Sequence, residues 1–309
     1  MKKILLTCPP MIGQLARFRE RFDEYGFEVT APEVVQTLSE DKLIEMVPSY
    51  DGWIIGDDPA TAAVFTAGRA GRLRAAVKWG VGVDNVDFKA CERLEIPIKN
   101  TPGMFGAEVA DLAICYLIGL ARDAFFIDRE IREGRWPKPS GISLLGRTVG
   151  VVGLGDIGGN IVRRCLALGL KVIGWDPVVK SVPEHVTHRL WPEGIGECDF
   201  IIFACALTPA TEHMFDDGLL NKLKFGVRLI NVSRGGLLNE AVLVKALKSG
   251  LVLGAALDVF ESEPLHKCHE LRNFQQCIFG SHNASNTADA VERTSFLALD
   301  IMKSHLHGD

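Results

Sequence analysis

The sequence predicts an α/β protein built from two doubly wound parallel-sheet domains. Short apolar strands alternate with amphipathic helices in residues 1–100, and a second series of the same kind begins near residue 147. A long helical stretch at 106–133 and a Pro- and Gly-rich segment at 135–146 separate the two series. Because alternating strands and helices are joined by crossover connections, each series favours a parallel sheet covered by helices.

The first series predicts five strands. The start of the chain, MKKILLT, is too short in its apolar part for a signal peptide and is better explained as the first buried strand. Ser39 is a candidate N-cap for a helix over 39–47. The other elements expected here are a helix over 14–26 that ends in Gly26, strands at 27–32, 50–56 and 75–80, and a helix, strand and loop within 88–103.

The second series carries the strongest motif. It predicts strands at 147–153, 171–176, 198–205, 227–233 and 252–260, with helices at 158–169, 219–226, 239–250 and 288–306. Gly153, Gly155 and Gly158 match G-x-G-x-x-G between its first strand and first helix, and Asp176 closes the next strand. That combination is the dinucleotide fingerprint, whereas the glycines alone could mark an ordinary turn.

Each residue of this motif has a physical role in binding a dinucleotide. Gly153 permits the tight turn, Gly155 lets the pyrophosphate approach the main chain, and Gly158 lets the helix pack close to the strand. The helix start at Ile157 and Gly158 offers unpaired N–H groups to the phosphates, and Asp156 just before it is a further candidate cofactor-binding residue.

The choice between NAD and NADP depends on the acid that ends the second strand of this series. Asp176 is expected to accept hydrogen bonds from the ribose hydroxyls and to repel a 2′-phosphate, so NAD is favoured over NADP. Lys180 is the nearest basic residue in that segment, and it leaves some NADP use open.

Composition excludes several classes of protein. The chain has 309 residues, a formal charge of −5, 47% apolar and 24% charged residues, which is ordinary for a soluble globular protein. There is no basic stripe for nucleic acid and no apolar run of membrane-spanning length. We therefore expect neither a nucleic-acid partner nor a membrane partner.

The cysteines favour a reduced, cytoplasmic protein. Eight are scattered along the chain, mostly in apolar runs, and none forms a C-x-x-C pair. His266, Cys268 and His269 lie together in HKCHE, but their spacing fits no usual zinc pattern. We expect a solvated loop there and no metal.

Three polar segments follow strands of the second series: INVSRGG, ALDVFESEP and FGSHNASNT. They contribute Arg234, Glu263 and His282. Because open α/β sheets bind ligands at the carboxyl ends of their strands, the three side chains are candidates for one site. A guanidinium can bind a carboxylate in bidentate fashion, and an alcohol oxidation needs a base. Taken singly, each has an ordinary alternative: a surface salt bridge, a solvated glutamate and a structural histidine.

Together these segments resemble the D-isomer-specific 2-hydroxyacid dehydrogenase family, and most of all its phosphoglycerate dehydrogenase branch. The resemblance covers nearly the whole chain. It rests on GVGVDNVD (80–87), NTPG (100–103), GLGDIG (153–158), WDP (175–177), LTPAT (207–211), NVSRGG (231–236), LDVFESEP (257–264) and SHNAS (281–285), in the family's order. It implies hydride transfer between NAD(H) and a D-2-hydroxy or 2-keto acid, with 3-phosphoglycerate as one possible substrate.

The resemblance also assigns roles to residues. Arg234 matches the arginine that binds the substrate carboxylate and keto oxygen, Glu263 the glutamate that orients the histidine, and His282 the general acid/base. The backbone N–H groups of Val81 and Gly82 would bind the substrate carboxylate. The remaining cofactor-binding assignments are Asp258 beside the nicotinamide carboxamide, Val232 and Ser233 on the same wall, Thr208 and Pro209 on the adenosine side, and Ala284.

The family fold implies a discontinuous domain. Residues 1–98 and 284–309 would form a flavodoxin-like substrate domain, and residues 99–283 an inserted Rossmann domain that binds NAD. The resemblance also implies a homodimer with the helix at 106–133 in its interface, and the apolar pattern on more than one side of that helix agrees with this.

Two departures from the branch leave the substrate open. Asp57 and Asp58 stand in IGDDPAT, where the branch often has an Arg-Ser loop for the substrate phosphate, and carboxylates would repel that phosphate. Lys78 either supplies a compensating cation for the substrate or merely ends a strand at the surface. No regulatory domain follows the closing helix, so serine feedback is not expected.

Two alternative functions remain open. One is a glyoxylate or hydroxypyruvate reductase, which belongs to the same enzyme class. The other is an NAD-sensing corepressor with this fold, which belongs to a different class. A corepressor needs a peptide-binding groove and usually disordered extensions, and the sequence has no Pro/Ser-rich extension.

Overall fold

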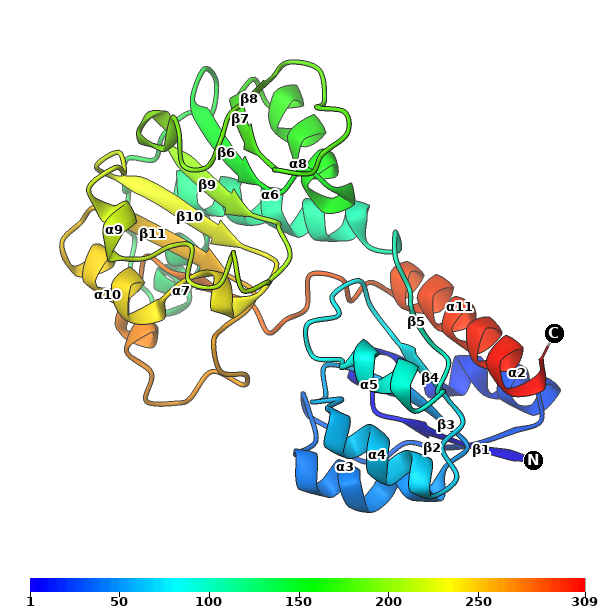
Figure 1. Cartoon of the computed structure of the whole chain (residues 1–309). Helices are drawn as coiled ribbons and strands as arrows, with labels where there is room; N and C mark the ends of the chain where they lie inside the picture. The colour runs from blue at the N-terminus through cyan, green and yellow to red at the C-terminus, as the bar shows by residue number, and fades with distance from the viewer. Residues whose placement is uncertain (309) are drawn as a thin grey trace. The chain divides into compact units, whose positions relative to one another are not determined.

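The computed structural model describes residues 1–308, which fold into two compact units (Figure 1). The first unit is Met1–Met104 together with the C-terminal segment from Asn286, and the second unit is Phe105–Ser285. The first unit holds a five-stranded sheet and the second a seven-stranded sheet. Every strand pairing in both is parallel, so the predicted fold class is confirmed.

The first unit has the strand order β2-β1-β3-β4-β5, in which the chain winds in both directions from the β1–β3 pair. Its strands are β1 (Lys2–Leu6), β2 (Phe27–Thr30), β3 (Gly52–Ile55), β4 (Ala75–Lys78) and β5 (Ile98–Asn100). Its helices are α1 (Pro9–Ile12), α2 (Arg19–Glu24), α3 (Glu40–Met46), α4 (Ala62–Ala70), α5 (Phe88–Arg93) and α11 (Ala288–His307), with 3₁₀ turns at Leu15–Phe18 and Val47–Ser49. All five strands predicted for the first series are therefore confirmed.

Helices cover both faces of this first sheet. α4 packs against α3 and α5 on one face, whereas α11 packs against β3, β4 and β5 on the other, beside α1 and α2 (Figure 1). Trp53 and Phe65 are fully buried in the layer under α4, and the Trp53 indole N–H donates to the Thr7 hydroxyl over 2.9 Å. The C-terminal helix thus covers one face of a sheet whose first strand begins at residue 2.

The second unit has the order β12-β11-β10-β9-β6-β7-β8, with the chain reversing direction between β6 and β9. Its strands are β6 (Thr148–Val152), β7 (Lys171–Trp175), β8 (Val186–His188), β9 (Phe200–Phe203), β10 (Val227–Asn231), β11 (Val252–Leu257) and β12 (Ile278–Phe279). Its helices are α6 (Gly106–Arg122), α7 (Ala124–Arg132), α8 (Asp156–Ala167), α9 (Asp217–Leu220) and α10 (Glu240–Lys248), with 3₁₀ turns at Ile195–Glu197, Gly235–Leu237 and Glu270–Asn273. This is the order of a dinucleotide-binding fold, whose ligand site is the reversal point.

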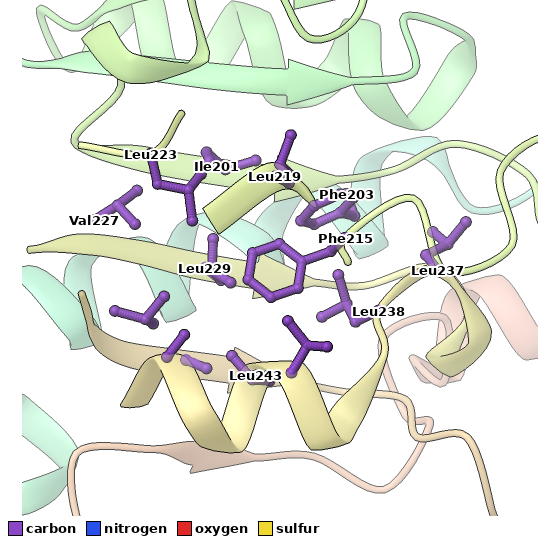
Figure 2. Close-up of a cluster of buried hydrophobic side chains, with 14 of the residues drawn as sticks. Ile201, Phe203, Phe215, Leu219, Leu223, Val227, Leu229, Leu237, Leu238 and Leu243 are labelled. Carbon is purple, nitrogen blue, oxygen red and sulfur yellow. The ribbon is translucent and has the colours of Figure 1, made fainter. Parts of the chain in front are cut away.

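The core of the second unit gathers around Phe215. Figure 2 shows side chains of β9, β10, α9 and α10 converging on its ring, among them Phe203, Leu229 and Leu243. These residues are fully buried. At roughly 25 cal/mol per Å² of apolar surface, such clusters supply most of the free energy that favours folding. They also fix the strand ends from which the polar segments leave.

Three predicted helices differ from the structure, and one of them, predicted over 14–26, is divided into the 3₁₀ turn Leu15–Phe18 and α2. The stretch predicted as one long helix is divided into α6 and α7 at Asp123, whose φ of 53° is left-handed. Aspartate tolerates this conformation better than most residues, so the periodic apolar pattern continues across a real break. The helix predicted over 219–226 is the single turn α9, and the sequence predicts no strand where β8 lies.

One aspartate in each unit fastens a central strand to its neighbour. Asp51, just before β3, accepts the Lys3 N–H over 2.7 Å and donates its own N–H to the Lys3 carbonyl over 2.8 Å. Asp199, just before β9, exchanges the same pair of bonds with Thr148, at 3.0 and 2.8 Å. The same pair of hydrogen bonds therefore joins a central strand to its neighbour in both sheets.

Two further findings hold for residues 1–308. No helix there is both long and apolar enough to cross a lipid bilayer. That part of the chain also holds no group of three or more His, Cys, Asp or Glu side chains placed to bind a metal ion. The cysteines are free thiols.

Candidate active site

The glycine loop after β6 leaves room for a ligand. Gly153 has a φ of +89°, and a Cβ there would lie 2.7 Å from the Cys205 Cα. A Cβ on Gly158 would lie 1.9 Å from the Gly153 carbonyl oxygen, so close helix–strand contact requires glycine. A Cβ on Gly155, by contrast, would have none of the described atoms within 4 Å. The backbone is therefore bare where the motif predicts a pyrophosphate.

Helix α8 begins directly behind this loop, with Gly155 as its N-cap. Asp156 is exposed and Ile157 is half-buried at the first turn, while the Gly159 N–H already donates to the Gly155 carbonyl over 2.8 Å. The amides ahead of Gly159 and the positive end of the helix dipole thus face the open loop, which suits an anion.

Asp176 lies directly after β7, and its carboxylate is fixed by two backbone amides. Oδ2 accepts the Leu154 N–H over 2.8 Å and Oδ1 accepts the Val178 N–H over 2.9 Å. The first of these bonds ties the acid to the glycine loop. Thr208 and Pro209 are exposed in a turn after β9, where the Thr208 N–H donates to the Thr211 hydroxyl over 2.8 Å.

The loop that carries Arg234 is held by Asn231, the last residue of β10. Its amide accepts the Ser233 N–H over 3.1 Å and donates to the Arg234 carbonyl over 2.8 Å. The Ser233 hydroxyl donates to the Cys205 carbonyl, which ties the loop to the end of β9, and Val232 is buried beneath it. Arg234 is half-buried, and its guanidinium donates to the Ser233 carbonyl over 2.9 Å.

Glu263 and His282 are brought together as predicted, from segments that follow β11 and β12. The Glu263 Oε2 lies 2.8 Å from the His282 Nδ1, and the two side chains are 19% and 20% exposed. The other carboxylate oxygen accepts the Phe260 N–H over 2.9 Å. A carboxylate at Nδ1 fixes the imidazole so that Nε2 is left to exchange a proton.

Asp258 forms hydrogen bonds with the backbone of the segment that carries His282. Its carbonyl accepts the His282 N–H over 2.7 Å, and its carboxylate accepts the Ala284 N–H over 2.8 Å. Burial raises the pKa of Asp258, although the amides and His282 act in the opposite direction. Tyr116 of α6 reaches the same carboxylate with its hydroxyl over 3.4 Å. The sequence offered no sign of Tyr116, because the two residues are 142 positions apart.

The loop segments also pack directly against each other. A Cβ on Gly235 would lie 1.8 Å from the Phe260 carbonyl carbon, so the residue after Arg234 abuts the segment that carries Glu263. A Cβ on Gly280 would lie 2.0 Å from an Asp258 carboxylate oxygen. Glycines at both places let three separate segments meet at the carboxyl edge of the sheet.

The predicted substrate residues Lys78, Val81 and Gly82 belong to the first unit, and their role there stays a prediction. Val81 is 40% exposed in the loop after β4. Lys78 ends β4 but is only 2% exposed, so the alternative of a surface lysine is wrong. Its ammonium donates to the Gly56 carbonyl over 2.7 Å and to Asp57 over 3.1 Å.

Comparison with known proteins agrees with this geometry. Residues 114–284 match the family model for the D-isomer specific 2-hydroxyacid dehydrogenase, NAD binding domain. The chain is 34% identical to D-3-phosphoglycerate dehydrogenase 2, chloroplastic, of Arabidopsis thaliana over 88% of its own length and 44% of that protein. It is 31% identical to a glyoxylate reductase of Korarchaeum cryptofilum over 96% of its own length and 90% of that protein. The crystal structure of the TT0316 protein from Thermus thermophilus superposes with a TM-score of 0.87 at 28% identity, covering 99% of this chain and 97% of that one.

The chain spans about half the length of the curated phosphoglycerate dehydrogenases that it matches and nearly all of the glyoxylate reductase. The family match covers the glycine loop, Asp176, Arg234, Glu263 and His282. The bare loop and the anchored acid fit NAD, which is the cofactor of the second unit. The chain belongs to the D-isomer-specific 2-hydroxyacid dehydrogenase family.

Proposed function

We propose that this protein is an NAD-dependent oxidoreductase that transfers a hydride between NAD(H) and a D-2-hydroxy acid or its 2-keto acid. The observation that carries the proposal is the 2.8 Å contact between Glu263 and the His282 Nδ1. This pair lies at the carboxyl edge of a sheet whose switch point carries the dinucleotide loop. A carboxylate–imidazole pair has a clear purpose there, since hydride transfer to a ketone needs a proton as well.

The cofactor would be held by the chain's own amides and by one carboxylate. Gly155 and the first turn of α8 would bind the pyrophosphate, and Asp176 would accept from the ribose hydroxyls. NAD supplies the hydride chemistry when it is bound. Val232, Ser233, Asp258 and Ala284 would line the nicotinamide side, and Thr208 with Pro209 the adenosine side.

The chain itself would bind and orient the substrate and move a proton. Arg234 would bind the substrate carboxylate and keto oxygen in bidentate fashion. In the reducing direction, His282 would donate the proton on Nε2 to the carbonyl oxygen, and in the oxidising direction it would accept that proton. Glu263 would hold the ring through Nδ1 and stabilise its protonated form.

For the substrate, we propose a small unphosphorylated acid such as glyoxylate or hydroxypyruvate, ahead of 3-phosphoglycerate. By the resemblance to the family, the loop after β3 would lie at the far end of the substrate. At that loop the Lys78 ammonium, from the end of β4, is already paired with Asp57 and the Gly56 carbonyl, and Asp58 is a buried second carboxylate. Little positive charge is left there for a phosphate. The first unit would be the substrate domain, with Val81 and Gly82 as carboxylate ligands, and a homodimer is proposed through α6.

A substrate panel tests this proposal. The purified protein is given NADH with glyoxylate, hydroxypyruvate, pyruvate and the keto acid of 3-phosphoglycerate, and NADH absorbance is followed. We expect the unphosphorylated acids to be reduced with the higher kcat/KM. A higher kcat/KM for the phosphorylated acid would reverse the substrate choice.

Variants of the histidine–glutamate pair test the mechanism. His282→Ala and Glu263→Gln should each lower kcat by about 100-fold or more, because general acid–base catalysis is lost or misaligned. Glu184→Gln, at an exposed position, is the matched control. Unchanged turnover in His282→Ala would exclude the catalytic role of His282, whereas NAD binding without turnover of any keto acid would favour an NAD-sensing binding protein.

A further inference from the structure

Two glutamates that the proposed mechanism does not use form a reciprocal contact beside the active-site loops. The Glu240 N–H donates to the Glu261 Oε1 over 3.2 Å, and the Glu261 N–H donates to the Glu240 Oε1 over 2.8 Å. Each side chain thus binds the backbone of the other residue. We name this pair the glutamate clasp.

The clasp joins two of the three segments that carry the site's charged groups, those of Arg234 and Glu263. Glu240 is the first residue of α10 and follows the Arg234 loop closely along the chain. Glu261 lies two residues before Glu263, in the segment after β11. Gly235 packs against Phe260 in the same place, leaving no space for a β-carbon. A displacement of Glu261 would therefore move Phe260, whose N–H holds Glu263.

The clasp is itself supported on both sides. Glu240 is only 7% exposed, and its second oxygen lies 3.0 Å from the His269 Nε2. The Glu261 Oε1 that receives the Glu240 amide also lies 2.9 Å from the His213 Nε2. Burial raises the pKa of Glu240, so this carboxylate is costly to bury and is kept where its hydrogen bonds offset the cost. Such an arrangement limits the motion of both loops.

We propose that Glu240 and Glu261 are positioning residues, which hold the Glu263 segment so that Glu263 meets the His282 ring. This inference rests on the proposed function. Neither glutamate touches the substrate in it, and both act through Glu263. Since a shift of about 1 Å at a catalytic group can cost roughly 100-fold in rate, a loosened segment should affect turnover more than cofactor binding.

Two substitutions of Glu261 separate positioning from charge. Glu261→Ala removes the acceptor for the Glu240 amide, and kcat should fall about 10- to 100-fold while the KM for NADH stays within about twofold. Glu261→Gln keeps an acceptor oxygen at the same place and should recover kcat to within about threefold of the unsubstituted protein. Glu270→Gln is the control, because Glu270 lines the same hollow as the clasp and pairs with Lys248 rather than with the loop.

A nuclear magnetic resonance signature makes the test independent of turnover. With Glu263 at Nδ1, the His282 ring nitrogens should show the Nδ1–H tautomer, and Glu261→Ala should shift them toward a mixture while Glu261→Gln should not. The amides of Glu240 and Glu261 should also exchange slowly in the unsubstituted protein, which requires no variant to fold.

The outcomes distinguish this inference from the proposed function. If the unsubstituted protein reduces no keto acid, the proposed function fails, and the ring-nitrogen spectra and amide exchange still decide the clasp. Fast exchange at both amides, or Glu261→Ala with normal kcat and spectrum, would overturn it. An equal loss in the Ala and Gln variants would overturn it too, because the charge and not the held backbone would then matter.

Discussion

At the scale of single residues, we expect Asp176 to determine which cofactor the second unit favours. Asp176→Asn keeps an oxygen that can accept the Leu154 or Val178 amide but removes the negative charge. Because that charge repels a 2′-phosphate, the KM for NADPH should fall relative to the KM for NADH, by about tenfold for each 1.4 kcal/mol of repulsion removed.

Steady-state kinetics with both cofactors measure this ratio. Glu184→Gln is again the matched control, since it removes one exposed carboxylate from the same unit without touching the strand end. The ratio should stay unchanged in that control. A KM ratio that does not move in Asp176→Asn would show that Lys180 or another group sets the preference.

Site residues that belong to a local sequence motif could be predicted from the sequence. Contacts that form only when distant segments fold together could not. Gly155 and Asp176 follow from spacing, because the turn and the strand end lie within one β–α–β unit. The pairing of Glu263 with His282 was expected from the resemblance to a family. The Tyr116 hydroxyl and the Glu240–Glu261 contact have no local pattern, since each depends on which loops the finished sheet brings together.

At the scale of elements, α8 offers a matched pair of adjacent glycines. A Cβ on Gly158 would lie 1.9 Å from the Gly153 carbonyl oxygen, whereas the nearest atoms to a Cβ on Gly159 lie at 4.0 Å. Gly158→Ala should therefore displace the helix from the loop, destabilise the protein by about 1–3 kcal/mol or more, and abolish NAD binding.

Gly159→Ala should do the opposite. Alanine in a helix interior is favoured over glycine by about 0.8–1.0 kcal/mol, so this variant should unfold at higher urea and bind NAD normally. Urea unfolding and calorimetric titration with NAD measure both quantities. Equal behaviour of the two variants would contradict the close approach of α8 to the loop.

The boundaries of helices and strands could be predicted where the composition of the sequence changes. They could not be predicted where a single residue turns the backbone. The alternation of strands and helices identified both parallel sheets, and Gly26 marks the end of a predicted helix, although that stretch is divided into a 3₁₀ turn and α2. Asp123 interrupts α6 and α7 without interrupting the apolar pattern. The strand β8 has three mostly exposed residues, so it lacks the apolar run by which a strand is recognised.

At the scale of the whole molecule, low pH should lower the stability of both units, because each holds a strand in place through one buried aspartate. Burial by itself would raise the pKa of Asp51, but the Lys3 amide and Arg72 outweigh it and hold the pKa below its ordinary value. In the same way Lys224, the Thr148 amide and Arg147 outweigh burial and lower the pKa of Asp199.

The sign of the pH dependence follows from these directions. Below the ordinary aspartate pKa of about 3.9, the unfolded chain takes up protons that the native carboxylates still resist. The stabilisation is thus fully present above that pH and is lost as the pH falls through the lower native pKa values. Asp51→Asn and Asp199→Asn should each unfold at lower urea at neutral pH and lose less stability on acidification.

Urea midpoints at neutral and acidic pH check this expectation, and Asp217→Asn, at an exposed pair with Lys245, is the control. Burial raises the pKa of Asp58, so protonation there acts in the opposite sense and does not explain an acid loss. A variant whose acid loss equals that of the unsubstituted protein would exclude its aspartate as a cause.

The backbone at His282 is left-handed, with a φ of 55°, so the imidazole proposed to be catalytic is carried by a residue in a conformation that favours glycine. A β-carbon in that conformation costs roughly 1–2 kcal/mol. His282→Gly should therefore melt at a higher temperature than His282→Ala while being equally inactive. If so, the protein loses thermal stability at one position because the proposed mechanism needs an imidazole there.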